Sequence, residues 1–173
     1  MGRLGCKCGK TLSSVDSPNE IELMLFEGSV ISRLMNTHPD IFLADVMLDH
    51  DIPELFCWYC KDCERVYVFR EGHQMYNRLY QRQEHSNEIS LNNILQLREF
   101  YAYTDKQIQN PIDKNANFTL SDFFKKLPHP YRYYITEDLS MVYAYNMDNQ
   151  SIAHCYVLEA AYDDESNSTK GDQ

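Results

Sequence analysis

The sequence lacks the short motifs of several common enzyme classes. Only six of its 173 residues are glycine, and no G-x-x-x-x-G-K-[ST] phosphate-binding loop occurs. No serine lies in a G-x-S-x-G motif, and no histidine pair has the H-E-x-x-H spacing of zinc proteases. These absences predict a protein without enzymatic activity.

Long hydrophobic runs are also missing. No apolar stretch approaches the roughly 18 residues that a membrane-spanning helix needs. The first ten residues, MGRLGCKCGK, lack the apolar segment of a secretory signal, and Cys6 stands where a myristoylation signal has serine or threonine. We therefore expect a cytoplasmic protein.

Positive charge is scarce. Lysine and arginine number 16 against 26 aspartates and glutamates, which gives a formal net charge of −10. An acidic chain disfavours nucleic acids and anionic membranes and attracts basic proteins. The alternative is that the acidity only keeps the protein soluble.

Aromatic residues, in contrast, are abundant, with 13 tyrosines and eight phenylalanines, which suit half-buried sheets. Apolar alternation predicts strands at residues 20–26, 55–59, 65–69, 100–104, 131–136, 141–146 and 152–160. Helices are expected at residues 29–35, from Pro39 onward, and at 119–127. Residues 71–90 are polar and helix-permissive, and residues 105–118 have the composition of an exposed loop.

These elements predict an α+β protein in three parts. Residues 1–70 form a cysteine-containing N-terminal module. Residues 71–160 form an α+β part, in which helices are followed by an antiparallel β-meander. Residues 161–173 form a disordered acidic tail, because they are charged and lack an apolar anchor.

Two short cysteine pairs dominate the N-terminal part: Cys6-x-Cys8 and Cys60-x-x-Cys63. In a cytosolic protein such pairs indicate a metal site more than a disulfide framework, although unconnected buried thiols are the alternative. Two loops that each supply two thiolates meet the tetrahedral preference of zinc, and four cysteines leave no open position for catalysis. The pattern predicts one structural Zn²⁺.

The two pairs, with Gly9 after the first and flanking strands around the second, resemble the knuckles of zinc-ribbon proteins. The resemblance covers residues 1–70 and implies a zinc-ribbon-like module in which residues 27–54 are a helical insertion. It also implies a flexible backbone at Gly9, whereas Glu64 stands where ribbons usually have glycine. Zinc ribbons often serve transcription and translation, so a nucleic-acid-associated regulator is the alternative function.

The remaining cysteines and histidines are weaker candidates. Strand alternation places Cys57 and Tyr59 on one face and Trp58 and Cys60 on the other, so Cys57 is interpreted as a core thiol. Cys155 lies in an alternating strand and is also assigned to the core. The adjacent His154 points to the opposite face, which excludes a catalytic dyad. His50 lies in an acidic loop that is either a cation site or a solvated turn.

A tyrosine-rich segment follows residue 130. Tyr131 and Tyr133 could stack nucleobases, stabilise a sheet as a cross-strand ladder, or bind a protein. In its size, acidity and tyrosine content the chain resembles small bacterial immunity proteins. That resemblance implies a basic protein partner, such as a toxin, which would face the acidic residues near the aromatic sheet: Glu137, Asp138 and Asp148.

Overall fold

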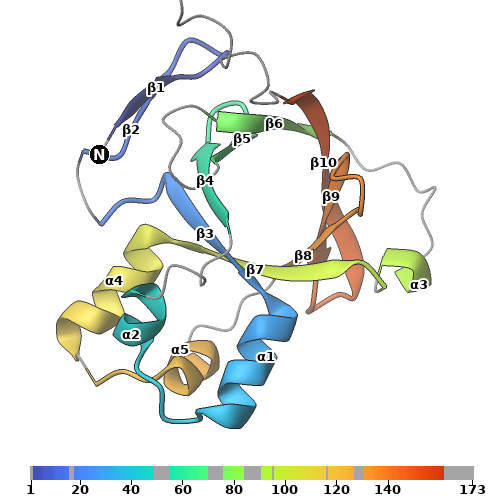
Figure 1. Ribbon diagram of the computed structural model, residues 1–173. Coiled ribbons are helices and arrows are strands. Elements are labelled where there is room, and N and C mark those ends of the chain that lie inside the picture. The colour runs from blue at the N-terminus through green and yellow to red at the C-terminus, as the bar shows by residue number, and fades with distance from the viewer. Residues whose placement is uncertain are drawn as a thin grey trace, which may run out of the picture.

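The computed structural model describes residues 2–15, 18–48, 55–69, 76–83, 91–94, 96–115, 117–126 and 131–161. Eight antiparallel strands close into a barrel in the order β10-β6-β5-β4-β3-β7-β8-β9, and Figure 1 looks along its axis. Closure leaves no free edge that could pair with another chain. The strands are β3 (Glu22–Glu27), β4 (Leu55–Cys60), β5 (Arg65–Phe69), β6 (Tyr76–Gln83), β7 (Arg98–Thr104), β8 (Tyr131–Ile135), β9 (Met141–Asn146) and β10 (Ser151–Ala161).

Two further units lie outside the barrel (Figure 1). A hairpin of β1 (Arg3–Gly5) and β2 (Thr11–Ser13) forms a separate small sheet. Four of the helices gather on one side, beside β3 and β7: α1 (Gly28–Thr37), α2 (Leu43–Leu48), α4 (Asp105–Lys114) and α5 (Leu120–Lys126). The four-residue α3 (Leu91–Ile94) precedes β7. None of the described helices is long and apolar enough to cross a lipid bilayer.

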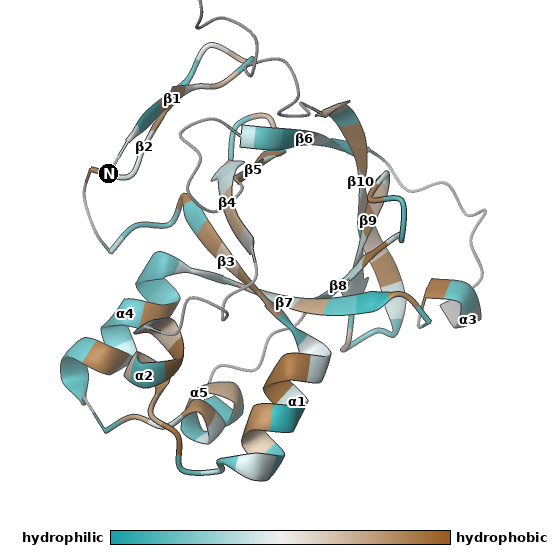
Figure 2. Ribbon diagram, viewed as in Figure 1, coloured by the Kyte–Doolittle hydropathy of each residue, from teal (hydrophilic) through white to brown (hydrophobic). Residues whose placement is uncertain are grey.

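The sheet separates an inner from an outer apolar layer. Along β7, Tyr101 and Tyr103 face outward and pack against the helices, whereas Ala102 and Thr104 face the interior. Figure 2 shows hydrophobic residues along both the strands of the barrel and the helices beside it. The outward tyrosines, with Phe123 and Ile108, belong to a helical cluster that buries one face of each helix. A packed apolar core therefore lies outside the barrel wall, and further apolar side chains face the interior.

The expectation of an α+β protein with a zinc-ribbon-like module and a helical insertion is wrong. The chain is mainly an antiparallel β-barrel with short helices. Strands from both sides of residue 70 belong to one sheet, because β3 pairs with β7 and β5 pairs with β6. The C-terminal strands β8, β9 and β10 lie where they were expected, but as part of the barrel wall and not as a separate meander.

Two segments have a different structure from the one expected. Residues 76–83, within the stretch described as helix-permissive, form β6. Residues 105–114, expected as a loop, form α4. This helix begins with a capping box, in which the Thr104 hydroxyl accepts from the Gln107 N–H and the Gln107 side chain accepts from the Thr104 N–H.

Residues 49–54, which include His50, and all of the expected tail except Ala161 lie outside the described residues.

The helical nature of residues 105–114 can be tested at Ile108, which is fully buried in the helical cluster. We expect Ile108→Ala to lower the free energy of unfolding by about 2–5 kcal/mol, since it removes packed methylenes and leaves a cavity. Urea unfolding measures the change. Asp113→Ala, an exposed position of the same helix, is the matched control. Equal stability of the two variants would show that this segment does not pack against the barrel.

Candidate functional site

Four cysteine sulfurs converge between the β1–β2 hairpin and the β4–β5 hairpin. The Sγ atoms of Cys6, Cys8, Cys60 and Cys63 all lie within 4.8 Å of one another. Individual separations are 3.4 Å for Cys6–Cys63, 3.4 Å for Cys6–Cys8 and 3.7 Å for Cys8–Cys60. A tetrahedral ion with metal–sulfur bonds of about 2.3 Å spaces its sulfurs by about 3.8 Å. The four cysteines therefore lie close enough to bind one metal ion.

The two hairpins shape the cluster through tight turns. The N–H of Gly9 donates to the Cys6 carbonyl at 2.9 Å, and the N–H of Glu64 donates to the Cys60 carbonyl at 2.7 Å. Both residues have a positive φ, 90° for Gly9 and 56° for Glu64. At Gly9 this conformation carries no steric penalty, because glycine has no Cβ, whereas the flexible backbone expected there stays a prediction. Glu64 adopts the left-handed conformation in spite of its side chain, which forms an ion pair with Arg82.

Backbone and side-chain donors set the ionisation of the thiols. Burial raises the pKa of Cys60 to about 12, although the N–H groups of Cys63 and Asp62 oppose this shift. Burial also acts to raise the pKa of Cys6, but the Cys8 N–H and the Tyr67 hydroxyl outweigh it and bring the pKa to about 7. Donors aimed at sulfur stabilise thiolates, which are the metal-binding form.

Tyr67 connects the cluster to the barrel wall. Its side chain is fully buried, and its hydroxyl donates to Cys6 Sγ at 3.1 Å and accepts from the Lys7 N–H at 3.0 Å. Burial raises the pKa of Tyr67, so the hydroxyl stays protonated and remains a donor. The role of Tyr67 at the cysteine cluster was not predicted from the sequence. Alternation along β5 indicates on which face the ring lies but not which thiol its hydroxyl contacts.

Basic side chains surround the cluster. Lys7 and Arg65 both pair with Glu159 of β10, each at 2.8 Å. Hydrogen bonds that the Arg65 guanidinium donates to the Glu159 carboxylate and to Cys63 raise the pKa of Arg65. Four thiolates and one divalent cation carry a formal charge of −2. Positive side chains close to the cysteine cluster offset this charge. The Lys7–Glu159 pair also joins the first cysteine loop to the barrel.

The other two cysteines lie apart from the cluster. Cys57 is 1% exposed and lines the barrel interior, and burial raises the pKa of its thiol to about 12. Cys155 is buried beside Tyr143 and Tyr145 on the outer side of the wall. The predicted alternation of Cys57 and Tyr59 against Trp58 and Cys60 is confirmed, because the first two line the interior and the last two pack with the cluster.

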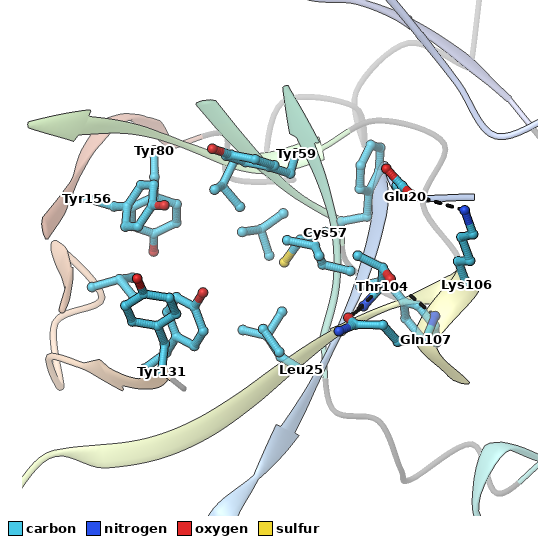
Figure 3. Close-up of a pocket in the computed structure, with 18 of the residues that line it drawn as sticks. Glu20, Leu25, Cys57, Tyr59, Tyr80, Thr104, Lys106, Gln107, Tyr131 and Tyr156 are labelled. Carbon is cyan, nitrogen blue, oxygen red and sulfur yellow. Dashed lines mark hydrogen bonds and ion pairs between the residues drawn. The ribbon is translucent and has the colours of Figure 1, made fainter. Parts of the chain in front are cut away.

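The second feature of the molecule is a cavity of about 1590 Å³ that includes the barrel interior. All eight barrel strands contribute to its lining, with aliphatic side chains such as Leu23, Leu25, Val66 and Val142. One face of α4 extends the lining beyond the barrel. Figure 3 shows Leu25 and Cys57 on one side of this space and Tyr80, Tyr131 and Tyr156 on the other.

Five tyrosines line the cavity: Tyr59, Tyr80, Tyr131, Tyr133 and Tyr156. Burial raises the pKa of Tyr80 and of Tyr133 to about 12, so both hydroxyls are neutral donors at physiological pH. Two lining residues carry a buried polar atom with no hydrogen-bond partner in the described part of the chain, Asn77 Oδ1 and His154 Nδ1. The wall thus combines apolar surface with a few polar groups, as small-molecule sites do.

The residues predicted to bind a partner are only partly brought together. Tyr131 and Tyr133 lie on β8 and line the cavity. Glu137 and Asp138 are exposed in the β8–β9 turn, where hydrogen bonds from Thr136 and Ser140 lower the pKa of Asp138 to about 2. Asp148 is exposed in the β9–β10 turn, at the opposite end of β9. Their role in binding a partner stays a prediction.

Residues 2–84 match a protein family described as a domain of unknown function (DUF8617). The matched stretch contains all four cysteines of the cluster and the strands β1 to β6, and it ends before β7. This match is not to a zinc-ribbon family. No curated protein and no solved structure matches the chain.

The role of Tyr67 gives a first test of the metal centre. We expect Tyr67→Phe to bind metal roughly 10–100-fold more weakly, because groups that hydrogen-bond to metal ligands tune affinity by about this factor. Chelator competition with added Zn²⁺ measures the change. Tyr145→Phe removes the hydroxyl of a buried tyrosine in a different cluster and should leave the affinity unaltered. Equal affinities for both variants would remove Tyr67 from the site.

Proposed function

We propose that the chain is a non-enzymatic binding protein in which a structural Zn²⁺ holds the N-terminal hairpin on a β-barrel, and the barrel interior receives a small molecule. The observation that carries the proposal is the cavity of about 1590 Å³ lined by all eight strands. The interior of an eight-stranded barrel is either filled by its own side chains or holds one small ligand. A cavity of this size supports the second case.

The donor set supports zinc as the metal. Four soft thiolates favour Zn²⁺ over hard cations such as Mg²⁺ or Ca²⁺, which take oxygen ligands. Four protein ligands complete a tetrahedral shell, so no position remains for a reactive water. A structural role also fits the hairpin, because the pairing between β1 and β2 is only three residues long and two-stranded hairpins are marginal on their own.

The metal centre and the cavity share a rim. Lys61 lies between Cys60 and Cys63 in the second cysteine loop, lines the cavity and pairs with Glu20. Glu20 also pairs with Lys106 of α4 at 3.2 Å. Figure 3 shows Glu20 and Lys106 joined beside the cavity. In this proposal the zinc ion holds one part of the cavity rim in place.

A basic protein partner, such as a toxin, remains a second hypothesis. The exposed carboxylates of Glu137, Asp138 and Asp148 favour it, together with the net charge of −10. Capture of a basic protein at low salt and its release at high salt would support it. A nucleic-acid-associated role is a further alternative, and filter binding with single- and double-stranded nucleic acid tests it.

The zinc proposal is tested by elemental analysis of protein purified under reducing, chelator-free conditions. We expect one equivalent of zinc per chain, and its loss in Cys60→Ser together with a lower melting temperature, because metal binding and folding are coupled. Cys155→Ser, which alters a buried thiol outside the cluster, should retain the metal. Full zinc content and an unchanged melting temperature in Cys60→Ser would refute the assignment.

The ligand proposal is tested with a neutral apolar dye, N-phenyl-1-naphthylamine, whose fluorescence rises in an apolar site. We expect saturable binding of one dye per chain and its loss in Val142→Trp, which places a large ring in the cavity. Val15→Trp, at an exposed position, is the control. Zinc content and the thermal transition show that each variant is folded. Absence of saturable binding to the unaltered protein would overturn the proposal.

A further inference from the structure

The charges along the cavity have the opposite sign to the protein as a whole. The chain carries a net charge of −10. Among the described residues that line the cavity, however, Glu20 is the one acidic side chain. Six lining side chains are basic: Lys61, Arg78, Arg98, Lys106, Lys114 and Lys126. A cavity lined in this way attracts anions at short range.

Some of these positive charges are already compensated. Glu20 pairs with both Lys61 and Lys106. Arg98 pairs with Glu27 at 2.6 Å. Within the described part of the chain, no carboxylate pairs with Arg78. Lys114 and Lys126 are exposed on α4 and α5, so the half-buried guanidinium of Arg78 is the strongest candidate for a direct contact with a bound anion.

Arg78 is placed within the barrel wall, where a ligand in the interior can reach it. On β6 it lies two residues before Tyr80, so the two side chains share the inner face. Its register partner on β5 is Val68, which also lines the cavity. The hydroxyl of Tyr80 donates to the Leu139 carbonyl at 2.8 Å, which fixes the neighbouring ring.

The half-buried position of Arg78 gives an anion an energetic advantage. A guanidinium that is partly removed from water, with no counter-charge, has lost hydration without gaining an ion pair. A carboxylate or a phosphate accepts two parallel N–H bonds from the guanidinium, which is the strongest geometry available to arginine. A neutral head group cannot provide this compensation.

The remaining wall defines the rest of the ligand. Aliphatic residues from neighbouring strands line the cavity beside Arg78: Leu23 and Leu25 from β3, Val66 and Val68 from β5, and Val142 from β9. A small inorganic anion would leave this surface in contact with water. An attached apolar body would bury it, at about 25 cal/mol per Å² of apolar surface removed from water.

We propose that the barrel binds an anionic amphiphile, with its carboxylate or phosphate head at Arg78 and its apolar body among the aliphatic side chains of the interior. This inference rests on the proposed function, since it names the class of ligand for the same cavity. The head is recognised by charge and by the fork of the guanidinium. The body is recognised by apolar contact alone.

Displacement of the neutral dye by four probes of equal chain length tests the inference. Dodecanoate and dodecyl phosphate carry an anionic head, dodecanol a neutral one and dodecylamine a cationic one. We expect the better of the two anions to bind about 10–100-fold more tightly than dodecanol, which is the factor expected for a charge-assisted bidentate contact. Dodecylamine should bind most weakly. The ranking of the two anions identifies the head group.

Substitution of Arg78 gives the second arm of the test. Arg78→Met should abolish the preference for anions and retain the affinity for dodecanol, because it keeps an apolar side chain and removes the charge. Arg33→Met, an exposed position on α1, should behave as the unaltered protein. Equal binding of dodecanol and the two anions, or an undiminished preference in Arg78→Met, would overturn the inference and leave the proposed function standing. Failure of the dye itself to bind would overturn both.

Discussion

The convergence of four sulfurs on one point is the constraint on which the position of the N-terminal hairpin depends. Cys6 and Cys63 are 57 residues apart in sequence, and their sulfurs lie 3.4 Å apart. In the described part of the chain the hairpin also contacts the barrel through the Lys7–Glu159 ion pair and through Leu4 and Leu12, which pack in a small apolar cluster with Tyr67 and Leu79. Thiolates without a cation would repel one another at this distance. A metal ion bound by the four sulfurs would replace that repulsion with metal–sulfur bonds that join the hairpin to the wall.

The same two strands build both candidate sites, because side chains of a strand alternate between its faces. In β4, Cys60 faces the metal cluster and Cys57 faces the cavity. In β5, Tyr67 donates to a ligand sulfur, whereas Val66 and Val68 line the interior. A change in the register of the β4–β5 hairpin would therefore alter both sites together. The pairing of Cys60 with Arg65 at the end of this hairpin maintains that register.

Local features of this fold and the convergence of the two cysteine pairs could be predicted from the sequence, whereas the pairing of distant strands could not. The spacing of the cysteines predicted the cluster, and alternation predicted the inward orientation of Cys57. Closure of the barrel depends on pairing between distant strands, β3 with β7 and β6 with β10, and apolar alternation does not specify partners. Strand β6 was missed because its inner face carries Arg78 and Arg82, so it lacks the hydrophobic stripe of an ordinary half-buried strand. Helix α4 was missed because Ile108 and Ile112 are its only large aliphatic residues, which is too few for a clear helical stripe. Pro111 inside the helix also argued against a helix.

The missed strand also places on its inner face a charge of opposite sign to the net charge of the chain. A net charge of −10 describes the whole chain, and the hypothesis of a basic partner followed from it. At physiological ionic strength, charges more than about 8 Å apart are largely screened by salt in water, whereas groups inside a low-dielectric cavity interact strongly. The sign of a buried site is thus set by the few residues that face it, and in β6 Arg78 is among them. Acidic residues on the exterior and basic residues along the cavity can coexist, because the acidic residues act on solubility and approach, whereas the basic residues would act on a ligand inside the cavity.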